Sequence, residues 1–398
     1  MIKKKRAHLF FLTLPFLLCA THSLFASFEF ANKSSHMVLM DESSQLNLSQ
    51  TPSKAWEEFS VIRNHAAEVP ATGVKIYSDT LEHYIFNIHG PGLINLAANY
   101  TLSYNMYLSS DHKLFVNDDL ILYGNDHEIN CALNTSNMIV IAANKNVTFD
   151  NIRLVNFSPN TFSLESGASV TFGDQTQIIL GDNQTLSTTW AFTGNASIYG
   201  QGNVLTLGSG SQITIAAGDS LLFKDINISG LQNTNIRCLD DTTTLSFENA
   251  ELSLTHDFLF IYGGIHVKED VTICGTNSFA YKTTQSLIID SESTLHLDQN
   301  VTFTYWPTGA TSNQLIQLTD ASSELHLTAC NINAVGIGLQ LTKGKLFIED
   351  KVTFDGPNSL ASAFVFGDGS SSANDLYVHF AGRIIVNTGY LEYKNVNN

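Results

Sequence analysis

The residues of this chain that most clearly offer chemistry are two adjacent carboxylates, Asp240 and Asp241, and an imidazole, His266. Two carboxylates near an imidazole could supply the general acid and general base that cleavage of a glycosidic bond requires. Asp is also a favoured turn residue, and a chain with 37 acidic residues is expected to contain adjacent pairs such as Asp118–Asp119. We therefore treat these three residues as catalytic candidates and favour the turn explanation for the pair.

Other side chains that could take part in catalysis or binding fit no known catalytic pattern. None of the 13 histidines stands in an HExxH pattern, and the chain has no GxSxG nucleophile elbow. His296 and His326 each lie in a Leu-His-Leu stretch, which places them on the polar outer face of a strand. Trp190, Tyr305 and Trp306 could stack on sugar rings, although structural roles are commoner for aromatic residues. The sequence predicts no metal and no cofactor.

The N-terminus predicts export. Residues 1–26 contain a basic start, Lys3–Arg6, and then the apolar run Leu9–Leu18, which is the pattern of a signal peptide. This run is too short for a bilayer span of about 20 residues. Cys19 raises a lipoprotein alternative, which we disfavour because the bulky Leu18 precedes it. We expect a protein of the cell envelope, cell surface or medium, without a membrane span after the signal peptide is removed.

Charge and cysteine content narrow the partners further. The chain has 20 basic and 37 acidic residues and no basic cluster after Arg6, so nucleic acid is not an expected partner. The remaining cysteines are widely spaced and form no CxxC motif, which argues against a zinc site. They fit small buried apolar residues, and one long-range disulfide stays open. These cysteines are Cys131, Cys238, Cys274 and Cys330.

A repeated unit dominates the chain. A β-branched residue or Leu, a small or polar residue and then Phe recur, as in Val147–Phe149 and Val170–Phe172, with an Asx two positions later in four copies. The recurrences are about 23–30 residues apart. Each unit contains two or three short alternating strands separated by Gly, Asp, Asn or Ser.

Such units fit the coils of a parallel β-solenoid. A single coil cannot bury its own apolar face, so coils stack and their inward side chains form ladders. The Asx residues should occupy turns, where left-handed conformations are tolerated. The stacking predicts one internal ladder of Val147, Phe149, Val170, Phe172, Phe223, Phe247, Val301, Phe303, Val352 and Phe354.

The stretches Val147–Phe157 and Leu221–Gly230 resemble the strand–turn–strand corners of right-handed parallel β-helix proteins of the pectin-lyase-like class. Passenger domains of bacterial autotransporters and polymorphic outer-membrane proteins share that architecture. The resemblance covers about residues 110–390 and implies an all-β, right-handed parallel β-helix. The GGA[ILV] and FxxN repeats of the polymorphic proteins have only loose counterparts, Gly263–Ile265 and Phe157–Asn160.

Enzymes of this class provide a test of the candidate residues. Hydrolases of the polygalacturonase kind carry Asn-Thr-Asp, Asp-Asp, Gly-His-Gly and Arg-Ile-Lys in that order. This chain has Asp240–Asp241, His266 and Arg383–Ile384, lacks the first and third motifs, and has Ile385 where the family has lysine. Lyases of the class need Ca²⁺ held by several carboxylates, so calcium is expected only under an enzymatic alternative.

The expected organisation is a signal peptide at 1–26, a leader and N-terminal cap at 27–80, a parallel β-helix at 81–390 and a tail at 391–398. Within the cap, residues 52–67 have the pattern of an amphipathic helix, which would cover the open strand edges of the first coil.

The leading functional hypothesis is an exported, non-enzymatic β-helix protein that acts as a surface, adhesion or binding scaffold. Its expected partner is a carbohydrate or a cell-surface protein. The alternative is a carbohydrate-active β-helix enzyme, a polysaccharide hydrolase or lyase, with a degenerate site at Asp240, Asp241 and His266.

Overall fold

The computed structural model describes a chain of β-strands joined by short turns. The expected signal peptide, leader and capping helix at 52–67 lie outside the described residues. Regular structure in the described part is entirely β apart from one 3-10 turn, η1 (Pro159–Thr161), and no helix there is long and apolar enough to cross a membrane. The described residues are 74–75, 92–96, 99–102, 105–108, 112–133, 138–233, 235–356, 363–370 and 373–396.

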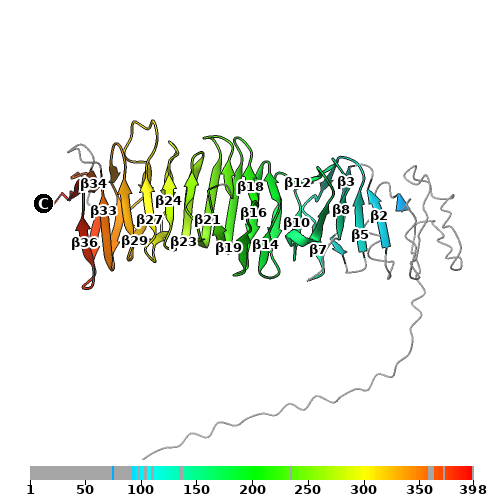
Figure 1. Ribbon diagram of the computed structural model, residues 1–398, viewed down its shortest axis with the longest axis horizontal. Helices are drawn as coiled ribbons and strands as arrows, with labels where there is room; N and C mark the ends of the chain where they lie inside the picture. Colours follow the sequence, from blue (N-terminus) through cyan, green and yellow to red (C-terminus); the bar gives the residue numbers. More distant parts are fainter. Residues whose placement is uncertain are drawn as a thin grey trace, which may run out of the picture. The chain divides into compact units, whose positions relative to one another are not determined.

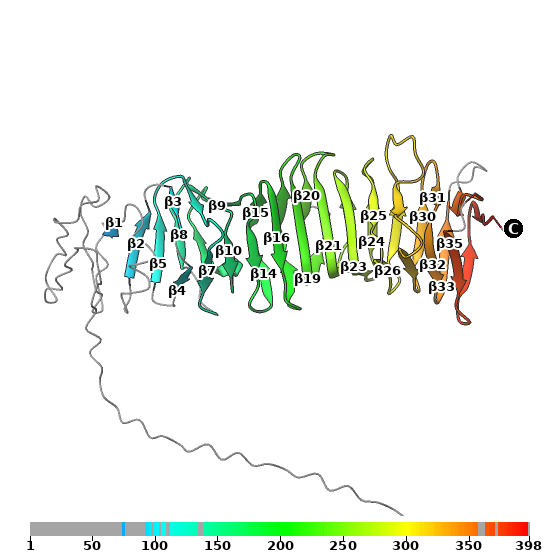
Figure 2. The same ribbon diagram turned by 180° about the vertical axis from the view of Figure 1, so that it is seen from behind.

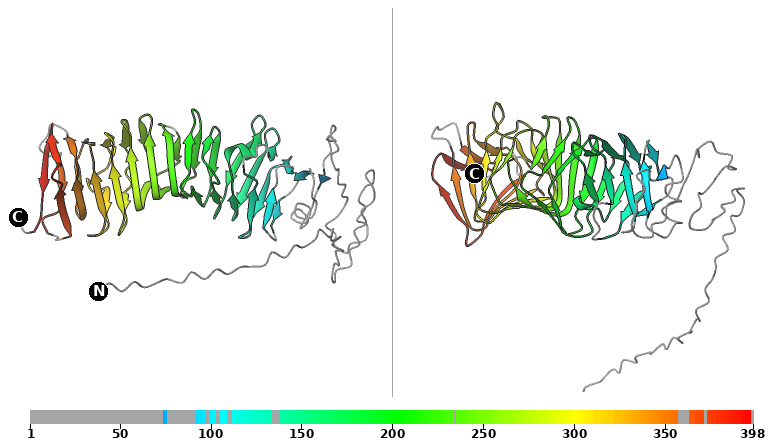
Figure 3. Two further views of the ribbon diagram at one scale, coloured as in Figure 1. Left: turned by 90° about the horizontal axis from the view of Figure 1, so that it is seen from below. Right: turned by 45° about the vertical axis from the view of Figure 1, so that its right-hand side comes forward.

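Parallel pairing between successive coils organises the strands into sheets. The unit that spans Val38–Asn398 contains all described strands, and they form a parallel β-solenoid of about 11 turns. Strands of successive coils stand side by side in chain order from β2 to β33 (Figures 1 and 2), and Figure 3 shows the same order from two further directions.

The largest sheet has 16 strands, of which twelve form one continuous ladder. In ladder order these are β4 (Met106–Leu108), β7 (Glu128–Cys131), β10 (Arg153–Val155), β13 (Gln177–Ile179), β16 (Asn195–Tyr199), β19 (Ser220–Leu231), β21 (Thr244–Leu254), β23 (Gly264–Cys274), β26 (Thr294–Leu297), β29 (Glu324–Leu327), β32 (Gly344–Ile348) and β35 (Asn374–Val378). Its side branches are β14 (Gln184–Leu186), β17 (Val204–Leu207), β25 (Leu287–Ile289) and β28 (Ile316–Leu318).

Four smaller sheets complete the coils. The first half has a five-stranded sheet of β1 (Val74–Lys75), β2 (Gly92–Leu96), β5 (His112–Val116), β8 (Ile139–Ile141) and β11 (Phe162–Leu164), and a seven-stranded sheet of β3 (Tyr100–Thr101), β6 (Leu120–Tyr123), β9 (Asn146–Asp150), β12 (Ser169–Phe172), β15 (Thr189–Phe192), β18 (Gln212–Ile215) and β20 (Ile236–Cys238). The second half has a six-stranded sheet of β22 (Phe258–Phe260), β24 (Ser278–Tyr281), β27 (Thr302–Tyr305), β30 (Asn331–Ala334), β33 (Lys351–Asp355) and β36 (Arg383–Val386), and a three-stranded sheet of β31 (Leu339–Leu341), β34 (Ala363–Phe366) and β37 (Tyr390–Tyr393). β37 thus extends pairing to Tyr393, within the range 391–398 that the sequence pattern assigns to a tail.

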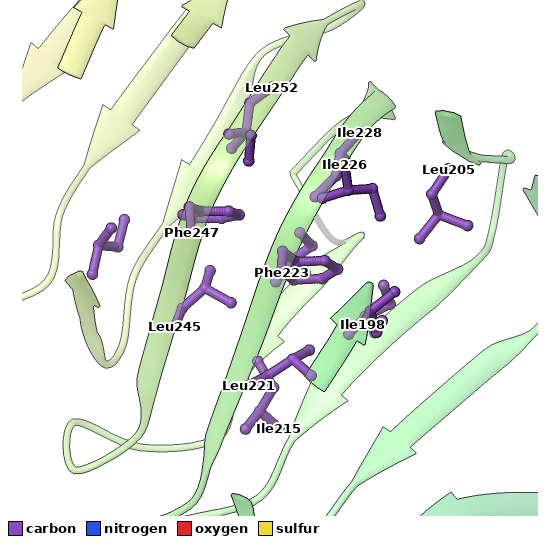
Figure 4. Close-up of a cluster of buried hydrophobic side chains, with 14 of the residues drawn as sticks. Ile198, Leu205, Ile215, Leu221, Phe223, Ile226, Ile228, Leu245, Phe247 and Leu252 are labelled. Carbon is purple, nitrogen blue, oxygen red and sulfur yellow. The ribbon is translucent and has the colours of Figure 1, made fainter. Parts of the chain in front are cut away.

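Alternation of apolar and polar residues decides which face of each strand is inside. In β29, Leu325 and Leu327 are buried, whereas Glu324 and His326 reach the outer face. Phe223 of β19 stacks on Phe247 of β21 with ring centroids 5.6 Å apart (Figure 4). Because each coil contributes such residues at the same position, the interior is a continuous apolar core.

The recurring apolar residues are buried as predicted, but the prediction that they form one ladder is wrong. Each coil contains several strands with the same alternation, so similar sequence spacing can connect strands that lie in different sheets. The seven-stranded sheet aligns Phe149, Phe172 and Phe192; the 16-stranded sheet aligns Ile198, Phe223, Phe247 and Val267; the six-stranded sheet aligns Phe279, Phe303, Ile332 and Phe354.

Coil length also varies more than the sequence spacing predicts. Residues paired across neighbouring coils are 20 positions apart between Phe172 and Phe192 and 32 positions apart between Phe354 and Val386. The turns absorb the difference, because inserted residues lie outside the paired strands.

Asp174 lies in a turn as predicted, and the other three Asx residues adopt the left-handed conformation that the turn role allows. Asn151, Asp225 and Asn249 have φ values of 45°, 50° and 48°, in the left-handed region. At the fourth copy the left-handed residue is Gln175, one position later, with φ 54°. The amide nitrogen of Asn249 donates to the Asp225 carboxylate at 2.8 Å, so corners of neighbouring coils also stack.

The four cysteines of the described region are free and buried. Burial raises the pKa of the Cys131, Cys238 and Cys330 thiols to about 12, so these thiols stay protonated at neutral pH. They therefore act as small apolar core residues.

Candidate functional site

Asp240 lies in the turn before β21 and binds the donors of that turn. Its carboxylate accepts hydrogen bonds from the side chain and backbone N–H of Thr242, from the Thr243 hydroxyl at 3.0 Å and from the Gly218 N–H at 3.3 Å. The hydrogen bonds from Thr242 and Thr243 hold the pKa of Asp240 below its ordinary value. The geometry makes Asp240 an organiser of this corner.

The other two predicted residues are not joined to Asp240 by a hydrogen bond or ion pair. Asp241 is exposed in the turn. His266 is in β23, opposite Ser246 of β21 and Ile288 of β25. Among the described residues, no hydrogen bond or ion pair connects Asp240 or Asp241 to His266.

A second cluster, which the sequence did not predict, lies on the outer face of the 16-stranded sheet. His296, His326, Phe347 and Tyr377 occupy directly opposed positions on β26, β29, β32 and β35. We call these four residues the outer column. Neighbouring ring centroids are 4.7 Å, 4.2 Å and 4.7 Å apart along the column. This spacing is that of paired strands, about 4.8 Å, so the backbone register itself stacks the rings.

Charged groups converge on His326 in this column. Its Nδ1 lies 3.0 Å from a carboxylate oxygen of Glu349, and its Nε2 lies 3.0 Å from a carboxylate oxygen of Glu324. Lys345 donates to Glu324 at 2.6 Å, and the Thr328 hydroxyl donates to Glu349 at 2.8 Å. A protonated imidazole donates from both nitrogens, so it would satisfy both carboxylates, whereas a neutral ring would satisfy one.

The surroundings lower the pKa values of two glutamates and one histidine in this cluster. Partial burial alone would raise the pKa of Glu324, but hydrogen bonds from Lys345 and His326 hold it below its ordinary value. Glu349 behaves in the same way, with Thr328 and His326 as donors. Partial burial and the neighbouring His326 lower the pKa of His296. At neutral pH the outer column therefore contains a neutral His296 and is flanked by the ionised carboxylates of Glu324 and Glu349.

These groups suit recognition of a polar ligand that also has an apolar face. Tyr377 is exposed at the end of the column, and Glu324, Lys345 and Glu349 supply hydrogen-bonding groups beside the rings. Two carboxylates, an imidazole and an ammonium are also the groups that general acid–base chemistry uses. The described residues contain no group of three or more His, Cys, Asp or Glu side chains placed to hold a metal ion.

Of the aromatic residues proposed for sugar stacking, one reaches the surface. Trp190 and Tyr305 are buried, whereas Trp306 is exposed just after β27, with the Lys282 Nζ 4.1 Å from its ring centroid. Ile261 and Tyr262, which follow β22, are also exposed. This edge of the solenoid is a second apolar feature of the surface, but it lacks the converging charges of the outer column.

The signal that could have revealed the outer column was the repeated Leu-His-Leu pattern at His296 and His326. It placed both histidines on the outer face, but the link to Phe347 and Tyr377 depends on the register of β32 and β35. The sequence does not predict which residues of two strands pair when 21 or 30 residues separate them.

Strand pairing assigns the protein to the parallel β-solenoids. No protein-family model matches the chain, and no curated protein and no solved structure matches it significantly.

Proposed function

We propose that the protein is an exported, non-enzymatic β-helix scaffold whose outer face binds a carbohydrate or a glycosylated cell-surface protein. The outer column with its charged neighbours carries this proposal. The signal-peptide pattern at 1–26 supports export, and the pectin-lyase-like corners support a right-handed β-helix of the kind used by surface proteins.

A carbohydrate suits this surface for geometric reasons. The strands repeat at about 4.8 Å, so one position in successive coils can contact successive groups of a chain-like ligand. Glu324, Glu349 and Lys345 offer acceptors and donors for hydroxyl groups, and Tyr377 offers an aromatic surface for an apolar sugar face. The strands that carry Glu324 and Lys345, β29 and β32, are paired on both sides, so little backbone ordering accompanies binding there.

A binding screen with charge-matched variants tests the proposal. The purified chain is titrated against a panel of neutral and acidic polysaccharides by isothermal calorimetry, beside the double variant Glu324→Gln/Glu349→Gln. The control is Asp240→Asn/Asp241→Asn, which removes the same charge at the corner before β21. We expect a panel ligand to lose roughly tenfold or more in affinity in the first variant and little in the control. Equal losses, or a loss confined to the control, would refute the outer column as the site.

One specific observation favours the enzymatic alternative. Two carboxylates and a lysine converge on His326 from β29, β32 and the turn after β32, on two neighbouring coils that contain none of Asp240, Asp241 and His266. Incubation of the chain with the same panel, with and without Ca²⁺, followed by mass spectrometry of released oligosaccharides, decides between the alternatives. Products that vanish in Glu324→Gln/Glu349→Gln would establish an enzyme with its site in the outer column. Products that vanish only in Asp240→Asn/Asp241→Asn would place it at the corner.

A further inference from the structure

The last coil of the solenoid differs from all earlier coils in having no successor among the described residues. β35, β36 and β37 are each the final strand of their sheet, and Figure 1 shows β36 at the end of the solenoid. A strand at the edge of a sheet offers backbone donors and acceptors to any further strand that can align with it.

Side chains in the inward columns of this coil are exposed. Val378, Ile384 and Val386 continue the columns of Ile348, Val352 and Phe354. The three earlier residues are 1%, 0% and 4% exposed, whereas their successors are 50%, 36% and 41% exposed. The last described coil therefore presents core positions to solvent.

The exposed apolar surface at this end is large. Besides the inward residues it includes Ile385, Tyr390 and Phe380, the last of which is 95% exposed in the turn after β35. Taking about 200 Å² for a large side chain, the exposed apolar area is roughly 600 Å². Each partner in a stable protein interface buries about 600–1,000 Å², so the apolar part of this surface alone reaches the lower end of that range.

Charge at this end is balanced, unlike charge in the chain as a whole. Residues 374–396 contain two acidic residues, Asp375 and Glu392, and two basic residues, Arg383 and Lys394. The whole chain has 37 acidic and 20 basic residues. Two copies that meet at this end therefore avoid the repulsion expected between other parts of their surfaces.

We propose that the end face formed by β35, β36 and β37 binds the same face of a second copy of this chain. A two-fold axis through the interface makes the meeting edge strands antiparallel, which permits direct ladder hydrogen bonds. Such an isologous contact closes at two copies, and it buries the exposed ends of the inward columns on both. The interface leaves the outer faces of β26, β29 and β32 accessible in both copies.

Sedimentation velocity over a concentration series tests the proposal, with Val386→Lys as the disrupting variant and Leu239→Lys as the matched control. Leu239 is similarly exposed but lies after β20, far along the chain from the end face. We expect a dimer for the wild type and the control, and roughly tenfold or weaker dimerisation for Val386→Lys. A wild type that remains monomeric, that forms open-ended oligomers, or that dimerises equally well with Val386→Lys would overturn the proposal.

Two further measurements keep the test decisive if Val386→Lys fails to fold. Ile385 lies beside Val386 on β36, opposite Thr353 of β33, and Ile385→Lys should weaken dimerisation in the same way. In the wild type, amide hydrogen exchange of β36 should slow as concentration rises through the dimerisation range. Protection of β36 that is independent of concentration would mean that another part of the chain covers the end face, and would overturn the proposal.

Discussion

The outer face of the 16-stranded sheet differs between its first and last strands, although the backbone pairing is the same. In the first strands, Arg153 of β10 faces Glu128 of β7 at 3.4 Å, an exposed ion pair of the kind that contributes at most about 1 kcal/mol. In the last strands, His326 stacks on Phe347, contacts the tilted ring of His296 and approaches two carboxylates at 3.0 Å.

This difference shows how a solenoid acquires a site. Register supplies an even lattice of outward positions along the whole sheet, and it does so without regard to function. A site arises where consecutive coils place compatible side chains at the same position, as β26, β29, β32 and β35 do. The chemical properties of the outer column therefore depend on several coils together and not on any single coil.

Removal of the middle ring should have the largest effect on stability. Phe347 stacks on His326 and on Tyr377, so Phe347→Ala loses two ring pairs and should lower the free energy of unfolding by about 1–3 kcal/mol. Val155→Ala, at a half-buried position of β10, should cost less. Urea denaturation of both variants measures the comparison, and equal losses would show that the outer column is no better packed than the first strands.

Replacement of both carboxylates should flatten the acid side of the stability curve. The pKa values of Glu324 and Glu349 are lowered in the folded state, so their contribution is complete above the ordinary glutamate pKa of about 4.3 and is lost as pH falls through the lower folded-state values. Thermal midpoints between about pH 5 and pH 3 should therefore fall less steeply in Glu324→Gln/Glu349→Gln than in the wild type. Parallel curves would contradict this interpretation. Glu269→Gln, at an exposed corner, is the control for the change of charge.

His296 should produce a smaller effect at higher pH. Its pKa is lowered, so the folded state binds its proton less readily than the unfolded state does. The stabilising contribution is complete above the unfolded pKa of about 6.5 and decreases as pH falls below it. His296→Asn should therefore reduce the loss of stability between about pH 7 and pH 5, measured by urea midpoints. A steeper loss in the variant would mean that His296 is protonated and paired in the folded protein.

The solenoid architecture could be predicted from the sequence because it depends on the local alternation of apolar and polar residues. Leu-His-Leu and Val-Thr-Phe units fix which face of a strand is buried, and Asn151, Asp225 and Asn249 mark left-handed corners. The arrangement of the ladders was not accessible. Phe172 pairs with Phe192 and not with Ile198, since strands of different sheets share one pattern.

In the candidate sites too, contacts between residues close in sequence could be predicted and contacts between coils could not. Asp240 could be understood from its neighbours, because Thr242 and Thr243 follow it directly and bind its carboxylate. The partners of His326 come from two coils, and Glu349 approaches it across 23 residues. Such contacts depend on coil length, which varies from turn to turn.

The most direct measurement of the outer column as a ligand surface compares two tyrosines at opposite ends of the same sheet. Tyr107 of β4 and Tyr377 of β35 are both 46% exposed, so their replacement by Ala removes the same surface. The affinity of a panel polysaccharide should fall roughly tenfold in Tyr377→Ala and stay unchanged in Tyr107→Ala. An equal effect of the two substitutions, or a loss in Tyr107→Ala alone, would contradict the outer column as the binding site.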